Sequence, residues 1–167
     1  MTAGEKFEAW ARTFIKPSNY LGRYLNGMLI ELQDNDDFKE DTVGNFFADS
    51  ATRAARGFAF GATRKLYGDA VLASLLKQDP RFHRLGKGTA KSRMIYALTR
   101  VFVTQGDRCA CHQFNASFLL GSAGASVTAN LWERSERTGP FHTVKRFYTN
   151  VYMTALGHLI AEFVGGQ

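Results

Sequence analysis

Apolar side chains recur along most of this chain with the spacing of amphipathic α-helices. In the N-terminal segment Phe7, Trp10, Ala11 and Phe14 lie at i, i+3, i+4 and i+7, which places them on one helical face. Similar faces occur at residues 21–32, 43–58, 71–76, 94–102 and 144–155. No segment alternates strictly between apolar and polar residues, as a half-buried strand would. The pattern therefore predicts an all-α protein, a compact bundle of about six or seven helices.

Polar segments separate these faces. They are an acidic loop at 33–41, the corner QDPRFHRLGKG at 78–88, and the breaks at 104–112 and 133–140. The chain has 167 residues, of which 45% are hydrophobic, enough for one domain with its own core. We therefore expect residues 1–167 to form a single helical domain.

Residues 109–132 contain no Asp, Glu, Lys or Arg. A helix of about 20 such residues could span a bilayer, but the segment also contains several amide and hydroxyl side chains. We interpret it as the buried central helix of the bundle, with a membrane span as the alternative. Small residues allow two helices to approach closely, and those expected at helix contacts are Gly57, Gly61, Gly121, Gly124 and Ala125.

The corner at 78–88 has the residues of a turn between two helices. Asp79 precedes Pro80, and a residue before proline avoids the helical conformation. The Asp79 side chain can accept hydrogen bonds from nearby amides, and Gly86 and Gly88 allow positive φ. These four residues predict a structural corner.

The same corner could instead bind an anion. Its candidate ligands are Arg81, His83, Arg84 and Lys87, which could surround a phosphate or carboxylate with help from glycine-rich backbone amides. An Asp79–His83 pair could act as an acid and base, but no nucleophile motif accompanies it. We therefore predict no catalytic residue.

The Cys-Ala-Cys-His stretch at 109–112 resembles a metal site only in part. Cys109, Cys111 and His112 would need a fourth ligand from elsewhere to close a zinc site, and the spacing does not match covalent haem attachment. We interpret the cysteines as two ordinary thiols at the start of a helix.

The acidic loop at 33–41 does not match a calcium-binding loop. It has Lys39 and Asn45 where a calcium loop has glycine and glutamate. We predict no metal site and no cofactor.

The charge is strongly uneven. The net charge is +6, and between Lys77 and Arg100 there are seven basic residues and one acid, Asp79. Such a basic run attracts anionic lipid, an acidic protein or nucleic acid. No signal peptide is visible in the amphipathic N-terminus MTAGEKFEAWARTF.

Four segments together resemble a family of small exported bacterial proteins of uncharacterised function. They are GEKFEAWARTFIKPSNYLG, LLKQDPRFHRLGKG, SRMIYALTRVFVTQGD and FNASFLLGSAGASVTANLW. The resemblance covers most of residues 4–163. It implies secretion and residence in the bacterial envelope, periplasmic or membrane-associated, and it assigns no catalytic residue.

These observations favour a non-enzymatic interaction or assembly protein of the envelope with a basic, anion-attracting face. Its expected partner is an anionic membrane surface or an acidic protein, and it could form homo-oligomers. The alternative is a small-ligand or anion-binding protein, or an enzyme, centred on residues 78–88. Nucleic-acid binding is a weaker alternative, since charge alone would permit it.

Overall fold

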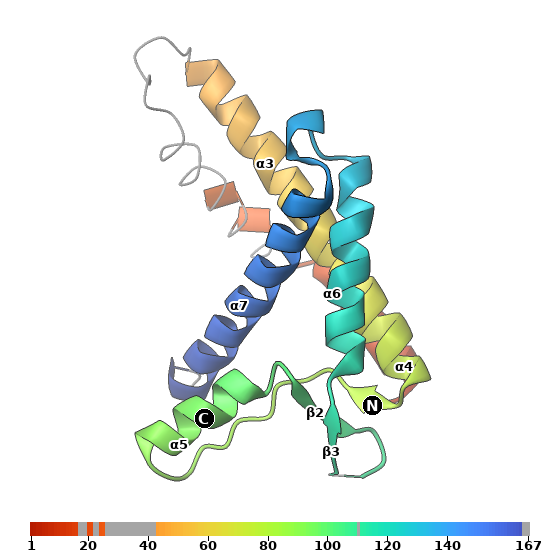
Figure 1. Ribbon diagram of the computed structural model, residues 1–167, viewed down its shortest axis with the longest axis vertical. Helices are drawn as coiled ribbons and strands as arrows, with labels where there is room; N and C mark the ends of the chain where they lie inside the picture. Colours follow the sequence, from red (N-terminus) through yellow and green to blue (C-terminus); the bar gives the residue numbers. More distant parts are fainter. Residues whose placement is uncertain (17–19, 22–23, 26–42, 110, 165–167) are drawn as a thin grey trace.

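The computed structural model describes residues 1–16, 20–21, 24–25, 43–109 and 111–164 (Figure 1). Helical residues make up 73% of this part, in five helices rather than six or seven. They are α1 (Ala3–Ala11), a long helix that begins as α3 (Val43–Arg64), α5 (Ala90–Thr99), α6 (Ala116–Thr128) and α7 (Pro140–Val164). Most of the helix predicted at 21–32 and the acidic loop at 33–41 lie outside the described residues.

The prediction of an all-α fold is wrong in one respect, because the protein contains a small antiparallel sheet. Its strands are β1 (Gln78–Asp79), β2 (Val103–Gly106) and β3 (His112–Phe114), in the order β1-β2-β3. Gln78 lies opposite Gly106, and Val103 lies opposite Phe114. Strands of two to four residues are too short to show an alternating pattern, so the sequence indicated only a corner and a polar break here.

The two helices predicted at 43–58 and 71–76 are parts of one long helix. It passes from α3 through a π-helical segment, η2 (Lys65–Leu72), into α4 (Ala73–Leu75) without a break. No proline interrupts residues 43–75, and a π-helical segment accommodates its different hydrogen-bond register within one continuous helix. The predicted helix at 71–76 is therefore the end of this longer helix.

Helix α6 crosses η2 with the two backbones in direct contact. A Cβ atom at Gly121 would overlap the backbone of Gly68, and a Cβ at Gly68 would lie 3.2 Å from the carbonyl oxygen of Ser117. Beside this crossing, Gly124 faces the ring of Tyr67 and Ala125 is fully buried. The residue that Gly121 meets is Gly68, which the sequence did not single out. Of the other two predicted contact residues, Gly61 is buried and Gly57 is half-buried in α3.

The side chains buried around this crossing are mostly small. Ala70, Ala73, Ala125, Ser122 and Ser126 have no exposed surface. Polar bonds also join α6 to α7, because Asn150 donates to the Ser122 hydroxyl at 2.9 Å and Arg146 donates to the Ser126 carbonyl at 2.8 Å. Hydrogen bonds and backbone contact therefore hold α6 in place with few large apolar side chains.

Helix α1 is fixed to the long helix by a buried lysine. The Lys6 ammonium donates to the Ala73 carbonyl at 2.9 Å and pairs with Asp107 at 2.5 Å. The Trp10 indole donates to the Ala62 carbonyl at 3.0 Å. Thr2 and Glu5 form a capping box at the start of the helix, which satisfies amides that have no partner within the helix.

The segment at 109–132 does not form one uncharged helix. It comprises part of the β2–β3 connection, β3, the 13 residues of α6 and a 3-10 turn at Ala129–Leu131. None of the helices in the described part of the chain is both long and apolar enough to cross a membrane. The α6 portion instead packs against η2, α3 and α7.

Adding a methyl group at the α6–η2 crossing should destabilise the protein. In Gly121→Ala the new Cβ would overlap the Gly68 backbone, so the helices must separate. Overpacking of this kind costs about 1–3 kcal/mol, which exceeds the gain of about 1 kcal/mol from replacing glycine by alanine in a helix. We expect the midpoint of urea unfolding to fall.

The matched control is Gly157→Ala in α7, where an added Cβ has no neighbour within 4 Å. Here only the helix-propensity gain operates, so the free energy of unfolding should rise. Stabilisation of both variants by similar amounts would contradict close backbone contact at Gly121.

Candidate functional site

The corner at 78–88 is held in place by its own polar side chains. Gln78 is almost fully buried; its amide nitrogen donates to the Phe114 carbonyl at 2.6 Å and its oxygen accepts from the Ser117 amide at 3.0 Å. The Thr104 hydroxyl donates to the Asp79 carbonyl at 2.6 Å. These bonds connect β1 to β2, β3 and the start of α6, so the first part of the corner belongs to the sheet.

The Asp79 carboxylate is bound by Arg81. The guanidinium donates to the two carboxylate oxygens at 3.0 and 2.6 Å, and the Arg81 amide adds a bond at 3.0 Å. His83 Nε2 lies 3.6 Å from the same carboxylate. Burial acts to raise the pKa of Asp79, but the hydrogen bonds and the positive charge of Arg81 outweigh it and lower the pKa to about 2. The group is therefore an ionised structural carboxylate at neutral pH.

The second part of the corner encloses a carboxylate from the far end of the chain. Glu162 of α7 is fully buried, and its oxygens accept from the Leu85 amide at 2.9 Å, the Gly86 amide at 3.0 Å and Arg93 Nε at 2.8 Å. Its backbone carbonyl accepts further bonds from Arg84 and Arg93. We call this arrangement the Glu162 clasp.

The clasp has the composition of an anion site. Gly86 has a φ of +66° and Gly88 a φ of +109°, conformations that glycine adopts without steric cost. Burial acts to raise the pKa of Glu162, but the bonds from Arg93, Gly86 and Leu85 outweigh it and lower the pKa. Backbone amides and a guanidinium thus bind a carboxylate, and that carboxylate belongs to the protein itself.

The proposed anion ligands therefore do not converge on one open site. Arg81 binds Asp79, Arg84 binds the Glu162 carbonyl, and Lys87 is exposed. His83 is half-buried, and its carbonyl accepts a bond from Tyr96 at 2.8 Å. The structure thus places Arg81 on the Asp79 carboxylate and Arg84 on a backbone carbonyl of α7.

Sequence reasoning missed Glu162 and Arg93, which complete the clasp. The available signal was that Glu162 is the only acidic residue of the 25-residue helix α7. A single acid on an otherwise uncharged helix end is often paired when it is buried. Its partners lie 69 to 78 positions earlier in the chain, so spacing alone could not identify them.

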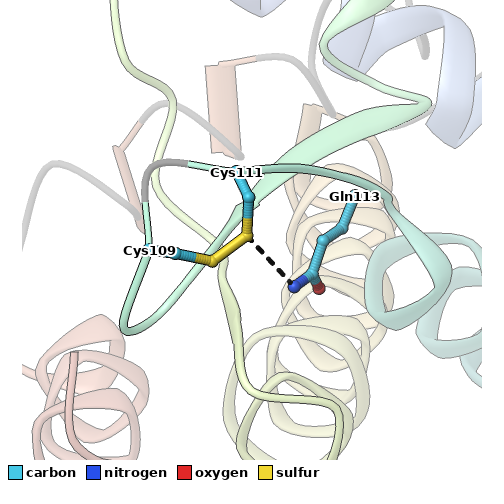
Figure 2. Close-up of a disulfide and its surroundings, with 3 residues drawn as sticks. All are labelled: Cys109, Cys111 and Gln113. Carbon is cyan, nitrogen blue, oxygen red and sulfur yellow. Dashed lines mark hydrogen bonds between the residues drawn. A yellow bond between two sulfur atoms is a disulfide. The ribbon is translucent and has the colours of Figure 1, made fainter.

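The interpretation of Cys109 and Cys111 as two ordinary thiols at a helix start is wrong. They lie in the connection between β2 and β3 and form a disulfide with each other (Figure 2). The Gln113 amide is directed at the Cys111 sulfur, 3.8 Å away, and Gly106 leaves space beside both sulfur atoms. Among the described residues, no group of three or more His, Cys, Asp or Glu side chains is placed to hold a metal ion.

Comparisons of this chain with protein-family models, with curated proteins and with solved structures find no match. The site must therefore be interpreted from its own geometry.

Removing the charge of Glu162 should weaken the fold strongly. In Glu162→Gln the half-buried Arg93 loses its anionic partner, and breaking a buried pair costs about 3–5 kcal/mol. The exposed Glu8–Arg12 pair offers a control, since Glu8→Gln should cost about 0–1 kcal/mol. Urea unfolding at pH 7 measures the loss of unfolding free energy in each variant. Equal losses in Glu162→Gln and Glu8→Gln would contradict a stabilising role for the clasp.

Asp79 should make the stability of the protein depend on pH in the acidic range. Its pKa is lowered to about 2 from an ordinary value of 3.8, so its contribution is full above pH 3.8 and is lost as the pH falls towards 2. Asp79→Asn should therefore be less stable than the wild type at pH 7, and the difference should shrink as the pH is lowered through this window. A difference that is constant from pH 7 to pH 2 would contradict the ionised Asp79–Arg81 pair.

Proposed function

We propose that this protein is a non-enzymatic interaction module that binds an anionic membrane surface, in the bacterial envelope as the family resemblance implies. The observation that best supports this proposal is the exposed apolar surface of α7. The exposed large apolar side chains of this helix are Phe141, Val144, Tyr148, Tyr152, Met153, Ile160, Phe163 and Val164.

Four of these side chains form a continuous stripe on α7. Phe141, Val144, Tyr148 and Tyr152 lie at i, i+3, i+7 and i+11, which places them on one helical face. Tyr148 is 65% exposed and Tyr152 is 63% exposed. We call these four residues the outer stripe of α7. Exposed apolar patches of this kind mark contacts with a protein or a membrane, and tyrosine suits the interface between lipid and water.

The outer surface of α7 also has few charges. Lys145 and Arg146 lie in its first two turns, and residues 147–164 contain one charged residue, Glu162. That glutamate is fully buried in the clasp, so it places no charge on the outer surface. An apolar, nearly uncharged helix surface matches a lipid interface better than nucleic acid, whose binding needs many basic contacts.

Helix α6 and the turn after it contribute a second face of the same kind. Leu120, Val127 and Leu131 are exposed and are spaced by seven and four residues. Helix α6 contains no charged residue. Together the two helices present exposed apolar rows that the described part of the protein leaves uncovered.

The basic run at 77–100 has a smaller part in this proposal than its composition suggested. Arg81 pairs with Asp79, Arg93 pairs with Glu162, and Arg100 is buried. Part of the positive charge of the run is therefore neutralised by an acid or withdrawn from the surface, whereas Arg84 and Lys87 stay exposed. Attraction to anionic lipid then depends more on the net charge of +6 and on insertion of apolar side chains.

The corner gives less support to the alternative of a small-anion binder. Its amides at Leu85 and Gly86 and its Arg93 side chain already bind the Glu162 carboxylate. An external anion would have to displace a buried group held by several hydrogen bonds. These groups are of the kind that binds an anion, but here they bind the Glu162 carboxylate and so attach α7 to the corner.

Vesicle flotation tests the membrane proposal. We expect the folded protein to float with vesicles of phosphatidylcholine and phosphatidylglycerol, less well with phosphatidylcholine alone, and less well as salt rises. Tyr152→Glu should reduce flotation by about tenfold, because a charge placed in the outer stripe opposes insertion.

The matched control is Ala90→Glu, which adds the same charge at the exposed first position of α5. A glutamate there is compatible with the helix N-terminus, so this variant should float nearly as the wild type does. Absence of flotation by the folded wild type, combined with dimers whose formation Tyr152→Glu abolishes, would show that a second copy covers the stripe.

A further inference from the structure

The disulfide between Cys109 and Cys111 lies where a thiol from outside the protein can reach it. It is in the connection between β2, which ends at Gly106, and β3, which begins at His112 (Figure 2). Both cysteines are exposed. The rate of thiol–disulfide exchange depends on access to the sulfur that is attacked, so this disulfide meets the first requirement for exchange.

The disulfide adds little to what already holds β2 and β3 together. It joins two cysteines that are separated by a single residue, and the stabilisation given by a disulfide grows with the length of chain it encloses. The two strands are paired by their own backbones, and the Gly106 amide donates to the Cys111 carbonyl at 3.2 Å. The disulfide can therefore open while the sheet stays folded.

The groups around the disulfide favour a thiolate on Cys111. The Gln113 amide is directed at the Cys111 sulfur, 3.8 Å away. Arg108 precedes Cys109 in the chain, and the acid before it, Asp107, pairs with Lys6. A hydrogen-bond donor and a nearby cation both favour the thiolate form of cysteine. A stabilised thiolate is a good leaving group in exchange.

Gly106 leaves room for the two sulfur atoms to separate. A Cβ atom at this position would lie 3.0 Å from the Cys109 sulfur and 3.2 Å from the Cys111 sulfur. When a disulfide is reduced, its sulfur atoms move apart from bonding distance to van der Waals contact. A side chain at position 106 would oppose that movement, and glycine does not.

We propose that the Cys109–Cys111 disulfide oxidises pairs of thiols by thiol–disulfide exchange. A substrate thiolate attacks the Cys109 sulfur, the bond between the two cysteines breaks, and Cys111 leaves as a thiolate that the Gln113 amide stabilises. The second substrate thiolate attacks the substrate sulfur of this mixed disulfide, which forms the substrate disulfide and releases Cys109. The two thiol protons of the substrate end on Cys109 and Cys111, so the dithiol loses two electrons and the protein disulfide gains them.

This activity goes beyond the proposed membrane contact and does not depend on it. The disulfide lies beside the sheet, whereas the outer stripe lies on α7 (Figure 1). The reaction consumes one disulfide per chain. A pair of cysteines in a polypeptide and a small dithiol share the chemistry that it requires, and the experiment below separates these two sources.

Anaerobic mixing of the oxidised full chain with one equivalent of a reduced peptide containing two cysteines tests the exchange. Acid quenching, alkylation and mass spectrometry follow the thiols of both partners. We expect the peptide disulfide to form at least about tenfold faster than with oxidised glutathione, an ordinary exposed disulfide. The Cys109→Ser, Cys111→Ser double variant should oxidise no peptide.

Two outcomes of this measurement would overturn the proposal. One is a rate no greater than that of oxidised glutathione, and the other is a wild-type chain that keeps two free thiols in air. Reduced dithiothreitol provides the small-dithiol arm. Exchange with both reagents would support a polypeptide substrate, and exchange with dithiothreitol alone would support a small one.

Two substitutions of Gln113 test its role as a positioning residue. Gln113→Ala removes the hydrogen bond to the leaving sulfur and should slow exchange by about threefold to tenfold. Gln113→Glu places a carboxylate beside that sulfur and should slow exchange further, which a purely structural role would not cause. Ala90→Glu adds the same charge on α5 and should react as the wild type does. Equal rates in all four proteins would contradict the role of Gln113.

A brief reaction with glutathione, a monothiol, identifies the sulfur that is attacked. After quenching and alkylation we expect glutathione on Cys109 and the alkyl group on Cys111. The opposite distribution would contradict the proposed order of attack. Urea unfolding of the oxidised and reduced chains should give nearly equal midpoints, and a large fall on reduction would identify a structural disulfide and overturn the proposal.

Discussion

The contact between the backbones of Gly68 and Gly121 governs how this protein is packed. Because neither residue has a side chain, α6 lies directly on the π-helical segment of the long helix. Backbone atoms and small side chains then fill the centre, where Ala125, Ser122 and Ser126 are fully buried. Many of the large apolar side chains of α6 and α7 are exposed instead.

A structure with such a small apolar core depends heavily on polar contacts. Lys6 holds α1 to α4 and to Asp107, Gln78 joins the sheet to α6, and Glu162 holds the corner against α7. Each of these side chains is nearly or fully buried. A buried polar group without its partner is costly, so these contacts should specify this arrangement over alternatives that would leave them unpaired.

The two ends of α7 differ in their surroundings. At its C-terminal end Arg93 and two backbone amides bind the Glu162 carboxylate. The exposed outer stripe, which runs from Phe141 to Tyr152, lies in the N-terminal half of the helix. We therefore place the proposed membrane contact on the N-terminal half of α7, and the clasp has a structural role.

The sequence by itself determined the mainly helical character of the chain and the local chemistry of its corner. Apolar periodicity is a local property, so the faces at Phe7–Phe14 and along α7 could be recognised without knowing their neighbours. Asp79, Pro80 and Gly86 likewise specify a turn through their own backbone preferences. Only the tertiary structure decided which groups meet across long separations: Gly68 with Gly121, Arg93 with Glu162, and Lys6 with Asp107. The three-stranded sheet was also decided by the tertiary structure, because strands of two to four residues are defined by the strands that they pair with and not by their own sequence pattern.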